Sequence, residues 1–95
     1  MSARGPIATS IKAKLRAALS PMDLTIDDES ARHAGHVGAR QGGESHFRVR
    51  IVSEKFNSLS RVERQRLVYA ALAEEIAAGV HALALTTLTP EESRR

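Results

Sequence analysis

The four histidines have the widest chemical range of any side chains in this sequence. Three of them lie in the stretch ESARHAGHVGARQGGESHF, from Glu29 to Phe47, and the fourth is His81. An imidazole can bind a metal ion through a ring nitrogen, or can exchange a proton near neutral pH. The question is therefore whether the stretch forms a metal site, an acid–base site, or only a connection between two strands.

Two of these histidines, His33 and His36, form an H-x-x-H pattern among glycines and alanines. The pattern alone indicates a metal only weakly, because closed zinc sites need four ligands. Its simplest interpretation is a pair of solvated loop histidines. His46 falls in an alternating stretch, on the face opposite Phe47, and we interpret it as a structural residue of a strand.

The chain has no cysteine. It can form no disulfide and can hold no metal through thiolates of its own, so a metal must be bound by histidine or carboxylate, or be shared with a partner. His81 follows Gly79 and Val80, between a predicted long helix and the last predicted strand. A histidine there can simply complement the partial negative charge of the helix C-terminus, so its role stays open on the residues alone.

Nucleic-acid binding by arginines is an alternative. The segment from Glu54 to Ile76 has a helix–turn–helix-like pattern, and a few phosphate contacts suffice for weak, salt-sensitive binding. The arginines of its second helix are Arg61, Arg64 and Arg66, and a strand adds Arg48 and Arg50. The simpler interpretation is a solvated helix face on which one of the last two helix arginines pairs with Glu63 or Glu74. The net charge of +3 is too small to decide between these alternatives.

An enzyme is the third class, and the sequence argues against it. It has no cysteine nucleophile, no G-x-S-x-G motif, and no pair of carboxylates in an evident cleft. The acidic run Asp27-Asp28-Glu29 is more typical of a solvated turn at a strand end. We therefore expect a binding protein without catalytic residues.

The elements that must position these side chains follow from hydrophobic periodicity. A chain of 95 residues forms one small domain, here with an expected ordered core from about 6 to 90 and a short basic C-terminal tail. Pro6 suits the first turn of a helix, which Ser20-Pro21 ends. Its predicted inward residues are Ile7, Ile11, Leu15, Ala18 and Leu19.

Two alternating stretches, MDLTIDDES and SHFRVRIVS, predict strands joined by a glycine-rich loop of about fifteen residues, a length typical of functional or disordered loops. Their predicted inward residues are Met22, Leu24, Ile26, Phe47, Val49 and Ile51.

The second half predicts a short helical turn in EKFNSLS, a long helix, and a last strand in HALALTTLT. Ser60 and Glu63 have the spacing of a capping box at the start of the long helix, which ends near Gly79. Its predicted inward residues are Val62, Val68, Tyr69, Leu72 and Ile76. Pro90 starts a final helical turn. The order predicts an α+β, two-layer sandwich, with a three-stranded sheet and its helices on one face.

Four strings in this chain resemble the BolA family: DDES, ESHFRVRIVSEKF, RVERQRLVYAALAEEI and VHALALTTLTPEE. The resemblance extends from about Ile7 to Glu92 and implies a fold similar to class II KH domains, which agrees with the predicted element order. Three positions depart from the family pattern. Asn57-Ser58 replaces a glycine, Gln65 replaces a histidine, and Ser93 replaces a tryptophan, which leaves the C-terminal tail without its anchor.

The resemblance also implies a function. Proteins similar to this chain bind a monothiol glutaredoxin and share a two-iron, two-sulfur cluster with it, and act in iron–sulfur assembly, delivery or iron regulation. The position of His81 supplies one ligand and the loop supplies the other. Here His33, three residues after Ser30, is favoured over His36. Such clusters accept two histidines in place of two cysteines on one iron. Other members are described as transcriptional regulators, so DNA binding in a stress response remains the alternative.

The first 22 residues are basic without an acidic residue, which superficially resembles a transit peptide, but the helical stripe favours a structural helix. We therefore expect a cytoplasmic protein.

Overall fold

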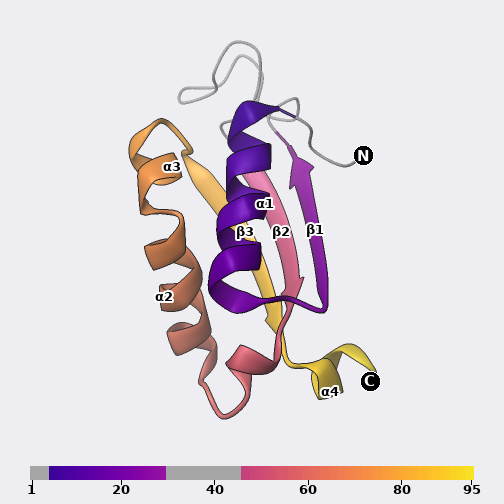
Figure 1. Ribbon diagram of the computed structural model, residues 1–95. Helices are drawn as coiled ribbons and strands as arrows, with labels where there is room; N and C mark the ends of the chain where they lie inside the picture. The colour runs from indigo at the N-terminus through magenta and orange to yellow at the C-terminus, as the bar shows by residue number, and fades with distance from the viewer. Residues whose placement is uncertain (1–4, 30–45) are drawn as a thin grey trace.

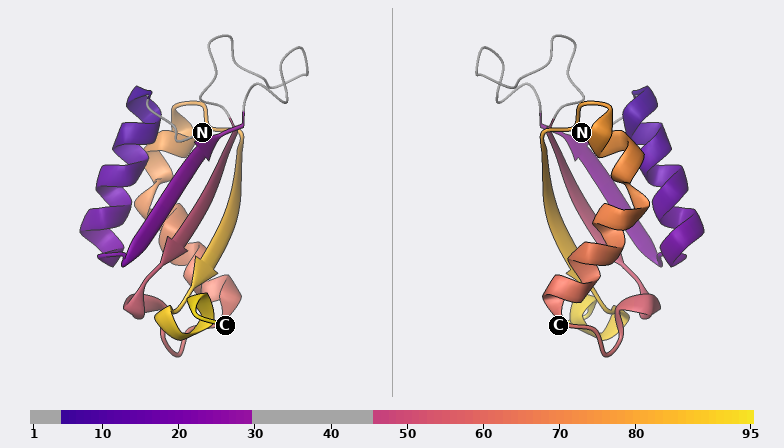
Figure 2. Two further views of the ribbon diagram at one scale, coloured as in Figure 1. Left: turned by 90° about the vertical axis from the view of Figure 1, so that its right-hand side faces the viewer. Right: turned by 90° about the vertical axis from the view of Figure 1, so that its left-hand side faces the viewer.

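The computed structural model describes residues 5–29 and 46–95, in which a three-stranded sheet is covered by helices on one face (Figures 1 and 2). The sheet order is β1-β2-β3, with β1 antiparallel to β2 and β2 parallel to β3. This arrangement confirms the predicted α+β fold. In chain order the elements are α1 (Pro6–Leu19), β1 (Asp23–Asp28), β2 (His46–Val52), η2 (Glu54–Phe56), α2 (Arg61–Ala71), α3 (Ala73–Ala77), β3 (Ala82–Leu88) and α4 (Pro90–Ser93).

The first helix, α1, has the predicted bounds. Pro6 occupies its first turn, and it ends at Ser20, whose φ of 44° places it in the left-handed region and whose N–H donates to the Arg16 carbonyl at 3.1 Å. The inward stripe differs from the prediction at two positions, because Ala8 is buried and Ala18 is exposed. The buried residues of the helix are Ala8, Ile11, Leu15 and Leu19.

The strands follow the predicted alternation except at the edge of the first one. Ile26 and Val49 are buried, and Leu24 is half-buried. Met22 was predicted to face inward, but its side chain is 62% exposed. It precedes the first residue of β1, and only its backbone joins the sheet, through an N–H donated to the Val52 carbonyl at 2.8 Å.

The long helix is divided in two and faces the sheet with a different stripe than predicted. Leu72, with φ −106° and ψ 17°, interrupts it between α2 and α3. Val62 and Tyr69 were predicted to be inward but are 55% and 43% exposed. The inward positions at helical spacing are Arg64, Val68, Leu72 and Glu75. Two of these four residues are charged. The prediction was based on apolar residues alone and therefore placed Val62 and Tyr69 on the inward face instead.

Each of those two charged residues has partners. Glu75 accepts from Ser10 Oγ, and Lys14 Nζ lies 2.8 Å from its Oε2 and 2.8 Å from Glu74 Oε1. Burial raises the pKa of Glu75, but the hydrogen bonds from Lys14 and Ser10 outweigh this effect, so its pKa falls below the ordinary value. The group therefore ties α3 to α1 as a charged pair.

Arg64 connects α2 to the C-terminal end of the chain. Its Nη1 donates to the Thr87 carbonyl at 3.0 Å and to Glu92 Oε1 at 2.7 Å, and its Nε donates to the Leu59 carbonyl at 3.1 Å. The Arg64 hydrogen bonds lower the pKa of Glu92 to about 2. The C-terminal segment is therefore anchored by an ion pair, contrary to the expectation that Ser93 leaves it without an anchor.

The capping box is formed as predicted. Ser60 Oγ accepts from the Glu63 N–H at 3.1 Å, and Glu63 Oε1 accepts from the Ser60 N–H at 3.1 Å. Before it, Ser58 has φ 68°, in the left-handed region that favours glycine. This strain lies where the BolA resemblance calls for a glycine. None of the helices within 5–29 and 46–95 is long and apolar enough to cross a membrane.

Candidate functional site

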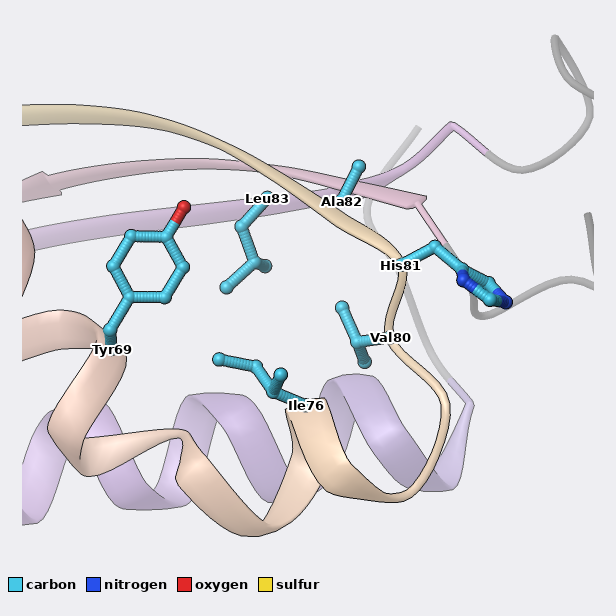
Figure 3. A pocket seen from close by; sticks show the side chains of 6 residues that line it. All are labelled: Tyr69, Ile76, Val80, His81, Ala82 and Leu83. Atoms are coloured by element: carbon cyan, nitrogen blue, oxygen red, sulfur yellow. The ribbon is translucent and has the colours of Figure 1, made fainter. Parts of the chain in front are cut away.

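His81 stands at the start of the last strand, and two local features hold its backbone there. Gly79, with φ 130°, reverses the chain after α3 in a conformation that favours glycine. Val80 is only 6% exposed, and its N–H donates to the Glu75 carbonyl at 3.3 Å. The His81 side chain is exposed and points away from the apolar side chains beside it (Figure 3). A fixed backbone thus presents an accessible imidazole.

His46 lies next to His81. It is the first residue of β2 and pairs with Ala82 in the parallel register, which brings the two imidazole rings to a centroid distance of 6.1 Å and an interplanar angle of 31°. His46 is half-buried, and its position beside His81 was not predicted from the sequence. The sequence places one histidine at the first residue of β2 and the other directly before β3, but only the parallel register of the two strands shows that these residues are neighbours.

The two described residues that flank the segment 30–45, Glu29 and His46, lie at one end of the sheet. The Glu29 N–H donates to the His46 carbonyl at 2.8 Å, so the described residues on both sides of the segment lie at the same end of the sheet as His81. The predicted loop ligands His33 and His36 lie outside the described residues. Among the residues that are described, no group of three or more histidine, aspartate or glutamate side chains is placed to hold a metal ion.

A surface pocket of about 340 Å³ lies beside His81, between the helix layer and β3 (Figure 3). Its walls are apolar apart from the Tyr69 hydroxyl and the His81 imidazole. The lining residues are Tyr69, Ile76, Val80, His81, Ala82 and Leu83. Such a wall can receive an apolar side chain.

The five candidate nucleic-acid residues fall into three environments. Arg64 is buried, and its carboxylate partner is Glu92 rather than the predicted Glu63 or Glu74. On the open face of the sheet, each strand arginine has an acidic partner: Arg48 Nε lies 3.1 Å from Glu29, and Arg50 Nη1 lies 2.7 Å from Asp23. The other two, Arg61 and Arg66, are exposed and make no ion pair with any other residue that the structure describes.

Comparison with known proteins places these features in a family. The family model described as BolA-like protein matches residues 15–92. BolA-like protein 1 of Homo sapiens is 48% identical over 90 residues, which cover 95% of this chain and 63% of that protein. The DNA-binding transcriptional regulator BolA of Escherichia coli is 45% identical over 86 residues, or 90% of this chain and 78% of that protein.

A solved structure agrees with these matches. The BolA domain of SufE1 from Arabidopsis thaliana superposes with a TM-score of 0.85 at 41% identity, covering 95% of this chain and 99% of that one. The chain spans about three-fifths of the length of the mammalian BolA-like protein 1 relatives, at 61% to 65% of each. The chain belongs to the BolA family.

Proposed function

We propose that this chain is an adaptor that binds a monothiol glutaredoxin and shares a two-iron, two-sulfur cluster with it, in iron–sulfur assembly, delivery or iron regulation. In this proposal His81 is one ligand, and a histidine of the segment 30–45 is the other, with His33 favoured over His36. The observation that carries the proposal is the exposed His81 imidazole beside His46, at the end of the sheet where Glu29 and His46 flank that segment.

The donor set fits a shared cluster. Because the chain has no cysteine, thiolates must come from the partner, while imidazole nitrogens can replace two thiolates on one iron. Histidine ligands raise the reduction potential of such a cluster relative to an all-thiolate one. The role of this chain is to present the ligands: Gly79 and Val80 fix the backbone, and His81 is free to turn its ring toward a partner.

His46 has a supporting role in this proposal. Its ring lies 6.1 Å from that of His81 and limits the directions in which the His81 ring can turn. Outer-shell contacts of this kind typically tune the orientation and affinity of a metal ligand. We therefore expect its loss to alter a cluster spectrum without abolishing it.

The test mixes the purified chain with a reconstituted monothiol glutaredoxin and records visible circular dichroism. The wild-type chain should change the spectrum of the glutaredoxin cluster, and His81→Ala should remove that change. His33→Ala combined with His36→Ala should also remove it, and the separate variants identify the ligand. His46→Ala is the matched control, a neighbouring imidazole whose removal should leave a cluster signal. An unchanged spectrum with the wild-type chain, despite complex formation, would contradict the proposal.

A second candidate function is DNA binding, and one observation favours it: Arg61 and Arg66 are exposed and make no ion pair with another residue that the structure describes. The charge of Arg66 acts on Glu63, whose pKa is lowered mainly by its hydrogen bonds with Ser60 and to a smaller extent by Arg66. A relative at 45% identity carries the name of a DNA-binding transcriptional regulator. If these arginines contact phosphates, replacing both by alanine should weaken binding to every DNA sequence tested. The slope of the logarithm of the binding constant against the logarithm of the salt concentration should fall in magnitude by about one for each lost contact. Arg48→Ala with Arg50→Ala is the control, and equal losses from both pairs would exclude the α2 surface as the specific site.

A further inference from the structure

The β3 strand is an edge of the sheet in the part of the chain that the structure describes, and one side of its backbone faces away from β2. Leu88 faces β2, since its carbonyl accepts from the Ser53 N–H at 3.0 Å. In a parallel ladder the residues of a strand alternate between the two sides. The N–H and C=O groups of Leu83, Leu85 and Thr87 must then face away from β2, toward the free edge.

Arg64 occupies an outward backbone group near the C-terminal end of β3. Its guanidinium donates to the outward Thr87 carbonyl at 3.0 Å and is itself held by Glu92 at 2.7 Å. No hydrogen bond from the described residues occupies the outward groups of Leu83 and Leu85. The edge is therefore blocked by a side chain near its C-terminal end and open next to His81.

The composition of β3 offers no protection against pairing. Exposed edges normally carry charged residues or proline, which prevent another strand from adding to them. The sequence of β3 is ALALTTL, with neither. The apolar pocket beside it is lined by Leu83, Tyr69 and Ile76, and so lies where an added strand would place one of its side chains (Figure 3). Backbone pairing combined with a side-chain pocket is the geometry of strand addition.

The arginines of α2 indicate which kind of partner the β3 edge can bind. Arg66 lies three residues before Tyr69, one turn along the same face of α2, and Arg61 is exposed at the start of the helix. No carboxylate lines the pocket. A second copy of the chain, paired through β3, would bring equivalent arginines toward each other. Nucleic acid would satisfy the arginines but not the apolar wall or the backbone groups of Leu83 and Leu85.

We propose that the β3 edge binds an extended segment of a partner protein, with alternating apolar residues and with acidic residues placed toward Arg66. One apolar side chain of the segment enters the pocket at Tyr69, and its backbone pairs with Leu83 and Leu85. This surface goes beyond the shared-cluster function and operates whether or not His81 binds iron.

The test is an NMR titration of the ¹⁵N-labelled full chain with short acetylated and amidated peptides. One peptide has two aspartates followed by alternating valine and threonine, and a second has the reverse order, because the direction of pairing is not fixed by the charges. The amide signals of Leu83 and Leu85 should shift and exchange more slowly with one of them. Replacing the aspartates with lysines should weaken binding by about fivefold.

Protein variants locate the contact. Tyr69→Ala, at an exposed position, should weaken binding by about fivefold, and Arg66→Gln by about threefold. Arg16→Gln, an exposed arginine of α1, is the matched control and should change nothing. The proposal is overturned if neither peptide shifts the Leu83 and Leu85 amides up to millimolar concentration. It is also overturned if these amides shift with protein concentration alone, which indicates a second copy, or respond to duplex DNA but to no peptide.

Discussion

The two ends of the sheet are built in opposite ways. At the Arg64 end, a buried guanidinium contacts the Leu59 and Thr87 carbonyls and the Glu92 carboxylate, so polar groups are satisfied within the chain. At the His81 end, an imidazole is exposed, an apolar pocket is open, and the backbone of Leu83 and Leu85 faces outward. Internally satisfied polar groups fix a fold, whereas exposed ones are available to partners. We infer that the first end serves stability and the second serves binding.

The largest expected effect is at the stable end. Arg64→Ala removes a buried cation and leaves the Leu59 and Thr87 carbonyls without this donor, while Glu92 keeps only the hydrogen bond from the Thr89 N–H. This change should lower the free energy of unfolding by about 3 kcal/mol. Urea unfolding followed by far-UV circular dichroism measures this difference. Arg61→Ala, an exposed arginine of the same helix, is the control and should change it by less than about 0.5 kcal/mol. Similar losses of stability from both variants would contradict the conclusion that the Arg64 end of the sheet stabilises the fold.

The pH dependence of the stability tests the same end of the sheet. The pKa of Glu92 is lowered from 4.5 to about 2, mainly by the hydrogen bonds from Arg64. A lowered folded-state pKa gives stability that is present above the unfolded value and is lost as pH falls from about 4.5 toward 2. Glu92→Gln should therefore lose less stability than the wild type across this range, although it is less stable at neutral pH. The exposed neighbour Glu91→Gln should follow the wild-type curve, and coincidence of all three curves would contradict the role of Glu92.

A smaller effect is expected in the turn that leads into α2. Ser58 has φ 68°, and glycine adopts this conformation without the steric cost of a Cβ atom. Because glycine also increases the entropy of the unfolded chain, Ser58→Gly should stabilise the protein by only about 0.5 kcal/mol. Thermal unfolding would show a small rise in Tm. A fall would mean that the Ser58 side chain makes a stabilising contact that outweighs the backbone strain.

The smallest effect on stability is expected at the binding end. His81→Ala removes an exposed side chain and should change the free energy of unfolding by less than about 0.5 kcal/mol. Urea unfolding at neutral pH, next to Arg64→Ala, tests this directly. A loss as large as that of Arg64→Ala would show that His81 supports the fold, and the division into a stable end and a binding end would fail.

Much of the fold was predictable because local rules and tertiary packing agree. Strand alternation, the Ser60–Glu63 capping box and Pro6 at the helix start each placed an element correctly. The inward stripe of α2 and α3 was predicted correctly at Val68 and Leu72, and wrongly at Val62 and Tyr69. The error arose because two charged residues, Arg64 and Glu75, occupy core-facing positions. Burial of those residues depends on Glu92, Lys14 and Ser10, which are distant in sequence.

The candidate site stays a prediction, and the structure adds the surroundings of one of its residues. The importance of His81 came from a family resemblance, and its exposure at the strand start agrees with a ligand role. The proximity of His46 depends on the parallel register of β2 and β3, which neither strand encodes alone. The choice between His33 and His36 stays a prediction, because both lie outside the described residues.

The measurement that tests the central proposal most directly is hyperfine EPR of the reduced cluster in the complex between a monothiol glutaredoxin and this chain labelled with ¹⁵N-histidine. If this chain supplies the imidazole ligands, the spectrum contains coupling from the label. His81→Ala should remove the part of the coupling that comes from His81, whereas His46→Ala should retain all of it. Absence of ¹⁵N coupling in a complex that holds the cluster would contradict the proposal that this chain supplies imidazole ligands.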